Sequence, residues 1–252
     1  MKYSIPDFQQ LNHVGALTAL CLKEIEAMIK PGITTHDINM AVGYYALSHN
    51  LVCATNGYRG FPANCCTSVN HVACHGIPSR NKVLKDGDII SVDVTFINKA
   101  GLHGDSCKTF FVGFDIPKKA MIVRDAALQA LWVGIEAAKP GNRIGHIGFA
   151  IQQHIEKNTP CSIVRQYVGH GIGRKFHEPP DVPHWCKESD IEKTPLLEPG
   201  MVFTIEPIIN FGEQGLKTLN DGWTTVTKDR SLSAQFEHTI GIREEGVEVF
   251  TQ

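Results

Sequence analysis

Asp93 lies in the middle of a stretch, GDIISVDVTF at residues 87–96, that is otherwise typical of a β-strand. Aspartate is depleted from strands, and a carboxylate that is buried without a partner is strongly destabilising. Because side chains alternate along a strand, Ser91, Asp93 and Thr95 share one polar face. A lone Asp could also be an ordinary turn or strand-end residue. Its place in the pattern instead predicts a polar site on this face.

A second carboxylate follows in LHGDSCKTFFVG, at residues 102–113. Asp93 and Asp105 are equally distant along the chain from Lys99 in the intervening turn, so a hairpin without a bulge would place them opposite each other. Like charges that are directly opposed in an antiparallel pair are destabilising. We therefore expect a positive charge between these two side chains.

Three further residues have the chemistry to join this pair. Glu206 lies on a polar strand face in LEPGMVFTIE, at residues 197–206. His170 lies between two glycines in GHGIG, where the backbone can approach a site closely. Alternation in SLSAQFEHTIGI gathers four side chains on another polar face, namely Ser233, Gln235, Glu237 and Thr239.

Four carboxylates and one imidazole on the inner face of a sheet would form a site for two divalent cations, because a carboxylate can bridge two metal ions. Oxygen-rich ligation with one nitrogen suits Mn²⁺, Fe²⁺ or Co²⁺ better than the Cys/His set of a structural zinc site. The sequence leaves Co²⁺, Mn²⁺, Fe²⁺ and Zn²⁺ open. A competing zinc site, with a spacing that fits no common finger pattern, would use Cys65, Cys66, His71, Cys74 and His75.

Two similar series of elements position these residues. An amphipathic helix that begins at Pro6-Asp7 and ends at Lys30-Pro31-Gly32 precedes a second helix at about 35–48. The same order recurs in a helix from Pro117 to Ala138 and a further helix at about 144–157. Each pair is followed by a His-Gly-Ile motif and by a strand that carries a carboxylate. This likeness predicts an α/β chain with two related halves, about 1–115 and 116–252, packed as one domain, 1–252.

Composition excludes several classes of protein. The 24 basic and 26 acidic residues give a net charge of -2, without the basic stripe of a nucleic-acid-binding protein. The amino terminus lacks a signal-peptide pattern, and no apolar run approaches the length of a membrane helix. We expect a cytoplasmic protein with no nucleic-acid or membrane partner. Its eight cysteines form no C-x-x-C motif, which predicts free thiols.

The motifs CHGIP, DVTF…HGDS, GHGIGRKFHEPP, FTIEP, DGW and SAQFEHTI resemble those of type I methionine aminopeptidases over almost the whole chain. The resemblance implies a pita-bread α/β fold, in which two pseudo-symmetric halves surround a curved, mixed or antiparallel sheet. It also implies a monomeric enzyme that removes the N-terminal methionine from nascent proteins when the second residue is small. A transient association with the ribosome is expected on the same basis.

The resemblance also assigns roles to residues. Two divalent metal ions would be bound by Asp93, Asp105, His170, Glu206 and Glu237, with Asp105 and Glu237 bridging. Glu206 would act as the general base, and His75 and His177 would contact the substrate as catalytic residues. The methionine pocket would be formed by Tyr58, Phe61, Cys66, Phe176 and Trp223. Aromatic rings and a soft sulfur suit an unbranched thioether.

Two departures from the family pattern stand out. Thr55 occupies a position where bacterial members commonly have cysteine, and the turn before Asp105 is one residue longer, which allows a bulge near Gly101. The chain shows neither the amino-terminal zinc-binding extension of eukaryotic type I forms nor the type II insertion, so a bacterial or organellar form is expected. Two alternatives stay open: a peptidase that removes residues ahead of proline with the same five ligands, and a non-enzymatic peptide-binding module.

Overall fold

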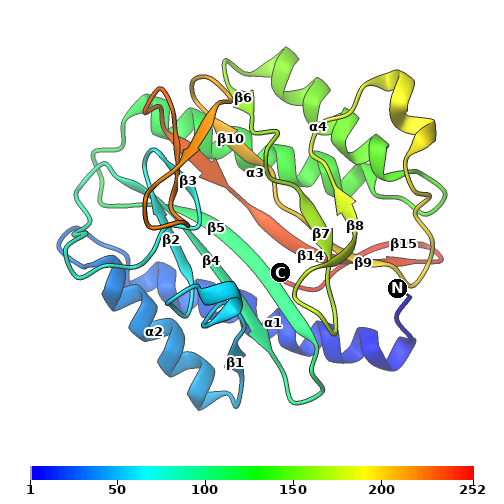
Figure 1. The fold of residues 1–252 in the computed structure, drawn as a ribbon, viewed down its shortest axis with the longest axis horizontal. Coiled ribbons are helices and arrows are strands. Elements are labelled where there is room, and N and C mark those ends of the chain that lie inside the picture. Colours follow the sequence, from blue (N-terminus) through cyan, green and yellow to red (C-terminus); the bar gives the residue numbers. More distant parts are fainter. Residues whose placement is uncertain (1) are drawn as a thin grey trace.

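A computed structural model describes residues 2–252, in which four α-helices pack on a large, twisted antiparallel sheet (Figure 1). The α-helices are α1 (Ile5–Met28), α2 (Thr35–Ser48), α3 (Lys118–Ala137) and α4 (Ile144–Asn158), and two short 3₁₀ helices are η1 (Tyr58–Gly60) and η2 (Glu188–Lys193). The four predicted α-helices are confirmed, each to within about two residues at its ends.

The main sheet has nine strands in the order β1-β4-β5-β14-β9-β7-β8, with β2 beside β4 and β15 beside β14. Their bounds are β1 (Val52–Cys53), β2 (Cys66–Val69), β4 (Ile89–Ile97), β5 (His103–Phe111), β7 (Gly169–Gly171), β8 (Glu178–Val182), β9 (Val202–Ile205), β14 (Glu237–Arg243) and β15 (Gly246–Val249). Two smaller sheets contain β3 (Val72–Cys74), β6 (Ser162–Ile163), β10 (Ile208–Asn210), β11 (Leu216–Thr218), β12 (Thr225–Thr227) and β13 (Ser233–Gln235).

Local sequence explains where the first two helices begin. Ser4 forms a capping box with Asp7 at the start of α1, and Thr34 does the same with Asp37 at the start of α2. The buried stripe of α1 includes Phe8, Leu11, Leu22 and Ile25, spaced at helical intervals. Because this apolar stripe must be buried, α1 packs with that side against the sheet.

Both helix pairs cover the same face of the main sheet. Gly104 on β5 packs against the backbone of α1, and Ile205 on β9 contacts α3 at Gly134. Because side chains alternate along a strand, Asp105 and Glu206 point away from the helices. The carboxylates are therefore directed to the open face, as the sequence predicts.

The β4–β5 hairpin corrects one expectation. Thr95 lies opposite Asp105, and Asp93 lies opposite Cys107, so the predicted direct opposition of Asp93 and Asp105 is wrong. The turn is centred one residue later than Lys99, because the Asn98 side-chain oxygen accepts hydrogen bonds from the N–H groups of Ala100 and Leu102, both at 3.0 Å. The pairing from Ile89 to Ile97 is continuous, so no bulge interrupts these strands. The two carboxylates become diagonal neighbours on one face.

The stretch SLSAQFEHTIGI also differs from expectation. Its residues divide between β13, which pairs with β10 in a small sheet, and β14, which begins at Glu237 in the main sheet. The chain changes sheets at Phe236. Glu237 nevertheless pairs with Cys107 on β5 and is buried.

Two hydrophobic clusters lie under the sheet. One joins α1 and α2 to the strands around β4, and the other joins α3 and α4 to the strands around β9 and β14. The eight cysteines are free, as predicted. Within residues 2–252, no helix combines the length and the hydrophobicity needed to cross a membrane.

The contact between α1 and the carboxyl-terminal segment at Phe250 gives a test of the fold. A Cβ on Gly15 would overlap the carbonyl of Phe250, so Gly15→Ala is expected to lower the free energy of unfolding by about 2 kcal/mol. In the matched control Gly43→Ala, the new Cβ meets only the side-chain amide of Asn64, whose hydrogen bond to the Asn39 carbonyl would have to shift. Helix propensity favours alanine there, so the loss of stability should be smaller than for Gly15→Ala. Urea unfolding midpoints measure both. An unchanged midpoint for Gly15→Ala would contradict this packing.

Candidate metal centre

The predicted site residues line one cavity of about 500 Å³. The cavity brings together Tyr58, Phe61, Cys66, His75, Asp93, Asp105, His170, Phe176, His177, Glu206, Trp223 and Glu237. Thr55 also lines it. These residues come from segments spread over most of the chain, so their convergence is a property of the fold and of no single motif.

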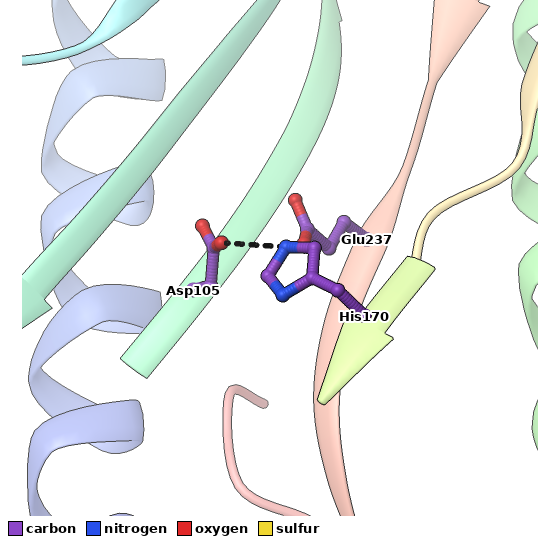
Figure 2. Close-up of side chains that lie close together, drawn as sticks. All are labelled: Asp105, His170 and Glu237. Atoms are coloured by element: carbon purple, nitrogen blue, oxygen red, sulfur yellow. Dashed lines mark ion pairs between the residues drawn. The ribbon is translucent and has the colours of Figure 1, made fainter. Parts of the chain in front are cut away.

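Three of the predicted ligands form a tight cluster. Asp105, His170 and Glu237 each direct one donor atom so that the three atoms lie within 4.8 Å of one another, as Figure 2 shows. The His170 Nε2 atom lies 3.9 Å from Asp105 Oδ2 and 3.5 Å from Glu206 Oε1. In residues 2–252 this is the one group of three such side chains with this spacing, so the alternative zinc site of Cys65 to His75 does not form.

Glycines on both sides of His170 let its strand fit between two others. A Cβ at position 169 would overlap the Thr204 carbonyl of β9, and a Cβ at position 171 would overlap the Pro179 carbonyl of β8. Only glycine fits at such distances. The predicted reason for the glycines in GHGIG is therefore confirmed.

Threonines next to the carboxylates fix their orientation. The Thr95 hydroxyl donates a 2.7 Å hydrogen bond to Asp105 Oδ1. Thr204 accepts a hydrogen bond from the His170 N–H (3.0 Å) and donates one to Glu206 Oε1 (2.9 Å). Thr204 thus links the backbone of His170 to the carboxyl group of Glu206, which is the kind of support that orients metal ligands.

Burial opposes ionisation of all four carboxyl groups. It raises the pKa of Asp93 to about 7 and that of Glu206 to about 8. Burial, reinforced by neighbouring carboxylates, also raises the pKa values of Asp105 and Glu237 well above their usual range. Four such groups need a strong positive charge between them to ionise together at neutral pH. A set of carboxylate oxygens with one imidazole matches divalent cations of the Mn²⁺, Fe²⁺ and Co²⁺ type.

The histidines of the cavity are neutral. Burial lowers the pKa of His170 to about 4, which leaves a ring nitrogen free to bind a cation. Burial, together with the charges of His170 and Arg59, lowers the pKa of His177 to about 3. Burial also lowers the pKa of His75. Neutral imidazoles can donate or accept one hydrogen bond without adding charge to the cavity.

One side of the cavity is apolar. Phe61 and Trp223 pack edge to face with ring centroids 5.2 Å apart, and Cys66 belongs to the same small cluster. His75 lies at its edge, with a ring centroid 6.0 Å from that of Trp223. This lining suits an unbranched, sulfur-containing side chain.

The segment that carries Phe176 and His177 is attached to the amino terminus. The Tyr3 hydroxyl donates a 2.7 Å hydrogen bond to Glu178 Oε1 and accepts one from the Arg174 N–H. The His103 ring nitrogen contacts the Gly173 carbonyl at 2.7 Å. These contacts bracket the segment at both ends.

Sequence reasoning missed several neighbours of these residues. Tyr167 packs edge to face on His75 at 5.2 Å, and buried His184 accepts a 3.1 Å hydrogen bond from the Glu206 N–H. Strand alternation does place Thr95, Thr204 and Gln235 on the polar faces of the predicted ligands, but it does not reveal their partners. Gln235, on a different strand from the nearby Glu237, donates a 3.3 Å hydrogen bond to Glu206 Oε2. No local signal marks Tyr167 or His184.

The family model for metallopeptidase family M24 matches residues 9–244. The chain therefore belongs to this family of metal-dependent peptidases.

Within that family, the chain groups with the methionine aminopeptidases. It is 48% identical over 245 residues to methionine aminopeptidase A of Synechocystis sp., covering 97% of this chain and 94% of that protein. Crystal structures of methionine aminopeptidases from Rickettsia prowazekii (42% identity) and Thermotoga maritima (34% identity) both superpose with a TM-score of 0.95, covering 100% of this chain and 99% of each of theirs. The predicted pita-bread α/β fold is confirmed, with every strand pairing in residues 2–252 antiparallel.

The raised carboxyl pKa values predict how stability depends on pH in protein stripped of metal. In the unfolded chain these groups lose their protons near pH 4, whereas the folded protein keeps protons on Asp93 and Glu206 up to about 7 and 8. The free energy of unfolding should therefore fall as pH rises, by up to about 1.4 kcal/mol per pH unit for each such proton.

The buried histidines, His170 and His184, have the opposite sign, because their folded pKa values are lowered and their contribution increases only up to about pH 6.5. The range from about pH 6.5 to 7.5, which lies below the ordinary pKa of the eight cysteine thiols, therefore reports mainly on the carboxyl groups. Urea unfolding in chelator should show a decline there, with a shallower slope for Glu206→Gln. Stability that rises with pH across this range would rule out the proton uptake described here.

Proposed function

We propose that the chain removes the N-terminal methionine from peptides and nascent proteins whose second residue is small. The observation that carries the proposal is the convergence of four carboxyl groups and one imidazole beside an apolar pocket in a single cavity. The names of its relatives, methionine aminopeptidases, support the same activity.

Two divalent ions would be held by Asp93, Asp105, His170, Glu206 and Glu237. The donor set fits such ions, because the buried carboxyl groups lack any other compensating charge at their centre. Divalent ions bound there supply the positive charge that polarises water and the scissile carbonyl. A free amino terminus offers a neutral amine as an additional donor, which would restrict the enzyme to chain ends.

Glu206 would act as the general base. It would accept a proton from the attacking water and pass it to the departing amine. Its two oxygens are already oriented, one by the Thr204 hydroxyl and the other by the Gln235 amide. A carboxylate held at both oxygens needs little reorganisation during proton transfer.

His75 and His177 would contact the peptide. His177 would stabilise the scissile carbonyl or the peptide beyond it, and His75 would hydrogen-bond near the departing nitrogen as negative charge develops. The methionine side chain would occupy the apolar pocket, which we assign to Tyr58, Phe61, Cys66, Phe176 and Trp223.

The proposal extends to organisation and setting. The chain would act as a single catalytic domain, residues 1–252, with related halves of about 1–115 and 116–252. We propose a monomeric, cytoplasmic enzyme that meets its substrates as nascent chains, in transient association with the ribosome.

Removal and replacement of metal tests the proposed reaction. Protein stripped with a chelator is expected to lose hydrolysis of Met-Ala-Ser, and refilling with Mn²⁺, Co²⁺, Fe²⁺ or Zn²⁺ should restore it to different extents. Release of free methionine measures the rate. An X-Pro peptide serves as the control, since a peptidase that acts ahead of proline would cleave it faster. Activity unaffected by stripping would contradict the proposal.

Substitution of His75 separates its role from metal binding. His75→Ala is expected to lower kcat for Met-Ala-Ser by about 100-fold or more, because a positioned hydrogen-bond donor at a developing charge contributes on this scale. Metal stoichiometry, measured by titration calorimetry, should remain that of the wild type. Unchanged turnover would remove His75 from the reaction, and loss of metal would assign it a structural role.

A further inference from the structure

Arg59 differs in charge from the rest of the cavity. Among the described residues that line the cavity it is the one lysine or arginine, whereas six lining residues are acidic, namely Asp93, Asp105, Glu178, Asp181, Glu206 and Glu237. Its side chain is exposed, so it lies at the mouth, while Asp105 and Glu237 are buried. None of the ion pairs found in residues 2–252 involves Arg59. Its charge is available to a ligand.

The backbone holds this residue in an unusual conformation. Arg59 has φ of 49°, in the left-handed region, between Gly57 and Gly60, whose φ values of 84° and 88° are also positive. Glycine would adopt this conformation at position 59 without strain, whereas a long side chain does so at a cost. Strain of this kind at the mouth of a cavity is typical of residues that contact ligands.

A column of rings connects Arg59 to the metal cluster. The guanidinium carbon lies 5.3 Å from the centroid of the Tyr58 ring, and Tyr58 is stacked on His177 with centroids 5.1 Å apart. The ring of His177 lies 4.0 Å from that of His170. Two rings, those of Tyr58 and His177, therefore lie between the Arg59 guanidinium and His170 of the metal cluster.

This spacing relates Arg59 to a position in a substrate. An extended peptide advances about 3.3 Å per residue. The three successive spacings of 5.3, 5.1 and 4.0 Å between Arg59 and His170 therefore correspond to an advance of at most about four residues beyond a first residue that lies at the metal cluster. Outside the metal cluster, Glu178 and Asp181 would repel a carboxylate, and Arg59 is the one lysine or arginine among the lining residues that would attract it.

We propose that Arg59 is a specificity-determining residue that binds a carboxylate at the third or fourth residue of the substrate. The inference rests on the proposed aminopeptidase function. The carboxylate can belong to an Asp or Glu side chain or to the end of a short peptide, and the two sources are separable by experiment.

The test compares kcat/KM for amidated pentapeptides that begin with Met-Ala and carry a single Asp or Asn at position three, four or five. Wild-type protein should favour Asp over Asn at position three or four by about two- to five-fold, as expected for an exposed ion pair. About 0.5 M NaCl should abolish the preference, because exposed charges are screened. A second arm compares Met-Ala-Ser as free acid and as amide. A preference in the first arm assigns Arg59 to side chains, and a preference only in the second assigns it to chain ends.

Variants assign the preference to Arg59. Arg59→Gln should lose it, so that kcat/KM for the Asp peptides becomes equal to that for the Asn peptides, and Arg59→Lys should keep part of it. Arg59→Gly removes the charge in a residue that suits the local φ, so it guards against misfolding. Arg80→Gln, which removes an exposed arginine that does not line the cavity, should leave the ratio unchanged.

Equal rates for Asp and Asn peptides and for free acid and amide in the wild type, or an undiminished preference in Arg59→Gln, would overturn the role of Arg59 alone. Failure of the wild-type protein to cleave any of these peptides would instead contradict the proposed function, and the inference with it.

Discussion

The structure depends on one electrostatic constraint, which is the gathering of two buried and two half-buried carboxyl groups around a single imidazole on one face of a sheet. Burial raises the pKa of each carboxyl group, and no lysine or arginine among the lining residues lies deep enough to compensate them. In the low dielectric of the cavity, several carboxylates ionise together only when cations lie between them. The family assignment to metal-dependent peptidases agrees with this requirement, which was reached from burial and charge alone.

Close approach of backbones makes this arrangement possible. Gly169 and Gly171 allow β7 to lie between β8 and β9, and Gly15 and Gly104 allow α1 to lie directly on β5. These contacts fix the positions of β7, which carries His170, and of β5, which carries Asp105. Threonine hydroxyls then orient the ligands themselves, as Thr95 does for Asp105. Small and short polar residues around the site therefore determine where the charged ones lie.

Strand alternation predicted the face of the metal-binding carboxylates correctly even where the predicted strand register was wrong. The register of the β4–β5 hairpin was wrong, yet Asp93 and Asp105 share a face as predicted, because moving the turn by one residue shifts each partner by two. The turn itself depends on hydrogen bonds of the Asn98 side chain, which strand alternation does not reveal. Tyr167 and His184 reach the site from loops far away in the sequence, so only the folded chain shows their contacts. Assignment of the helices succeeded because their capping residues and buried stripes are local features.

The position of the ligands in the sheet links the site to the cohesion of the fold. Strands β5 and β14 share only two residue pairs, although they join the strands packed on α1 and α2 to those packed on α3 and α4. Asp105 lies on β5, Glu237 on β14 and His170 on β7, so the three clustered donors come from both sides of this junction. A cation bound by all three would stabilise only the state in which the two sides are together. The residues best placed for chemistry are thus also those through which ligand binding would strengthen this narrow connection in the sheet.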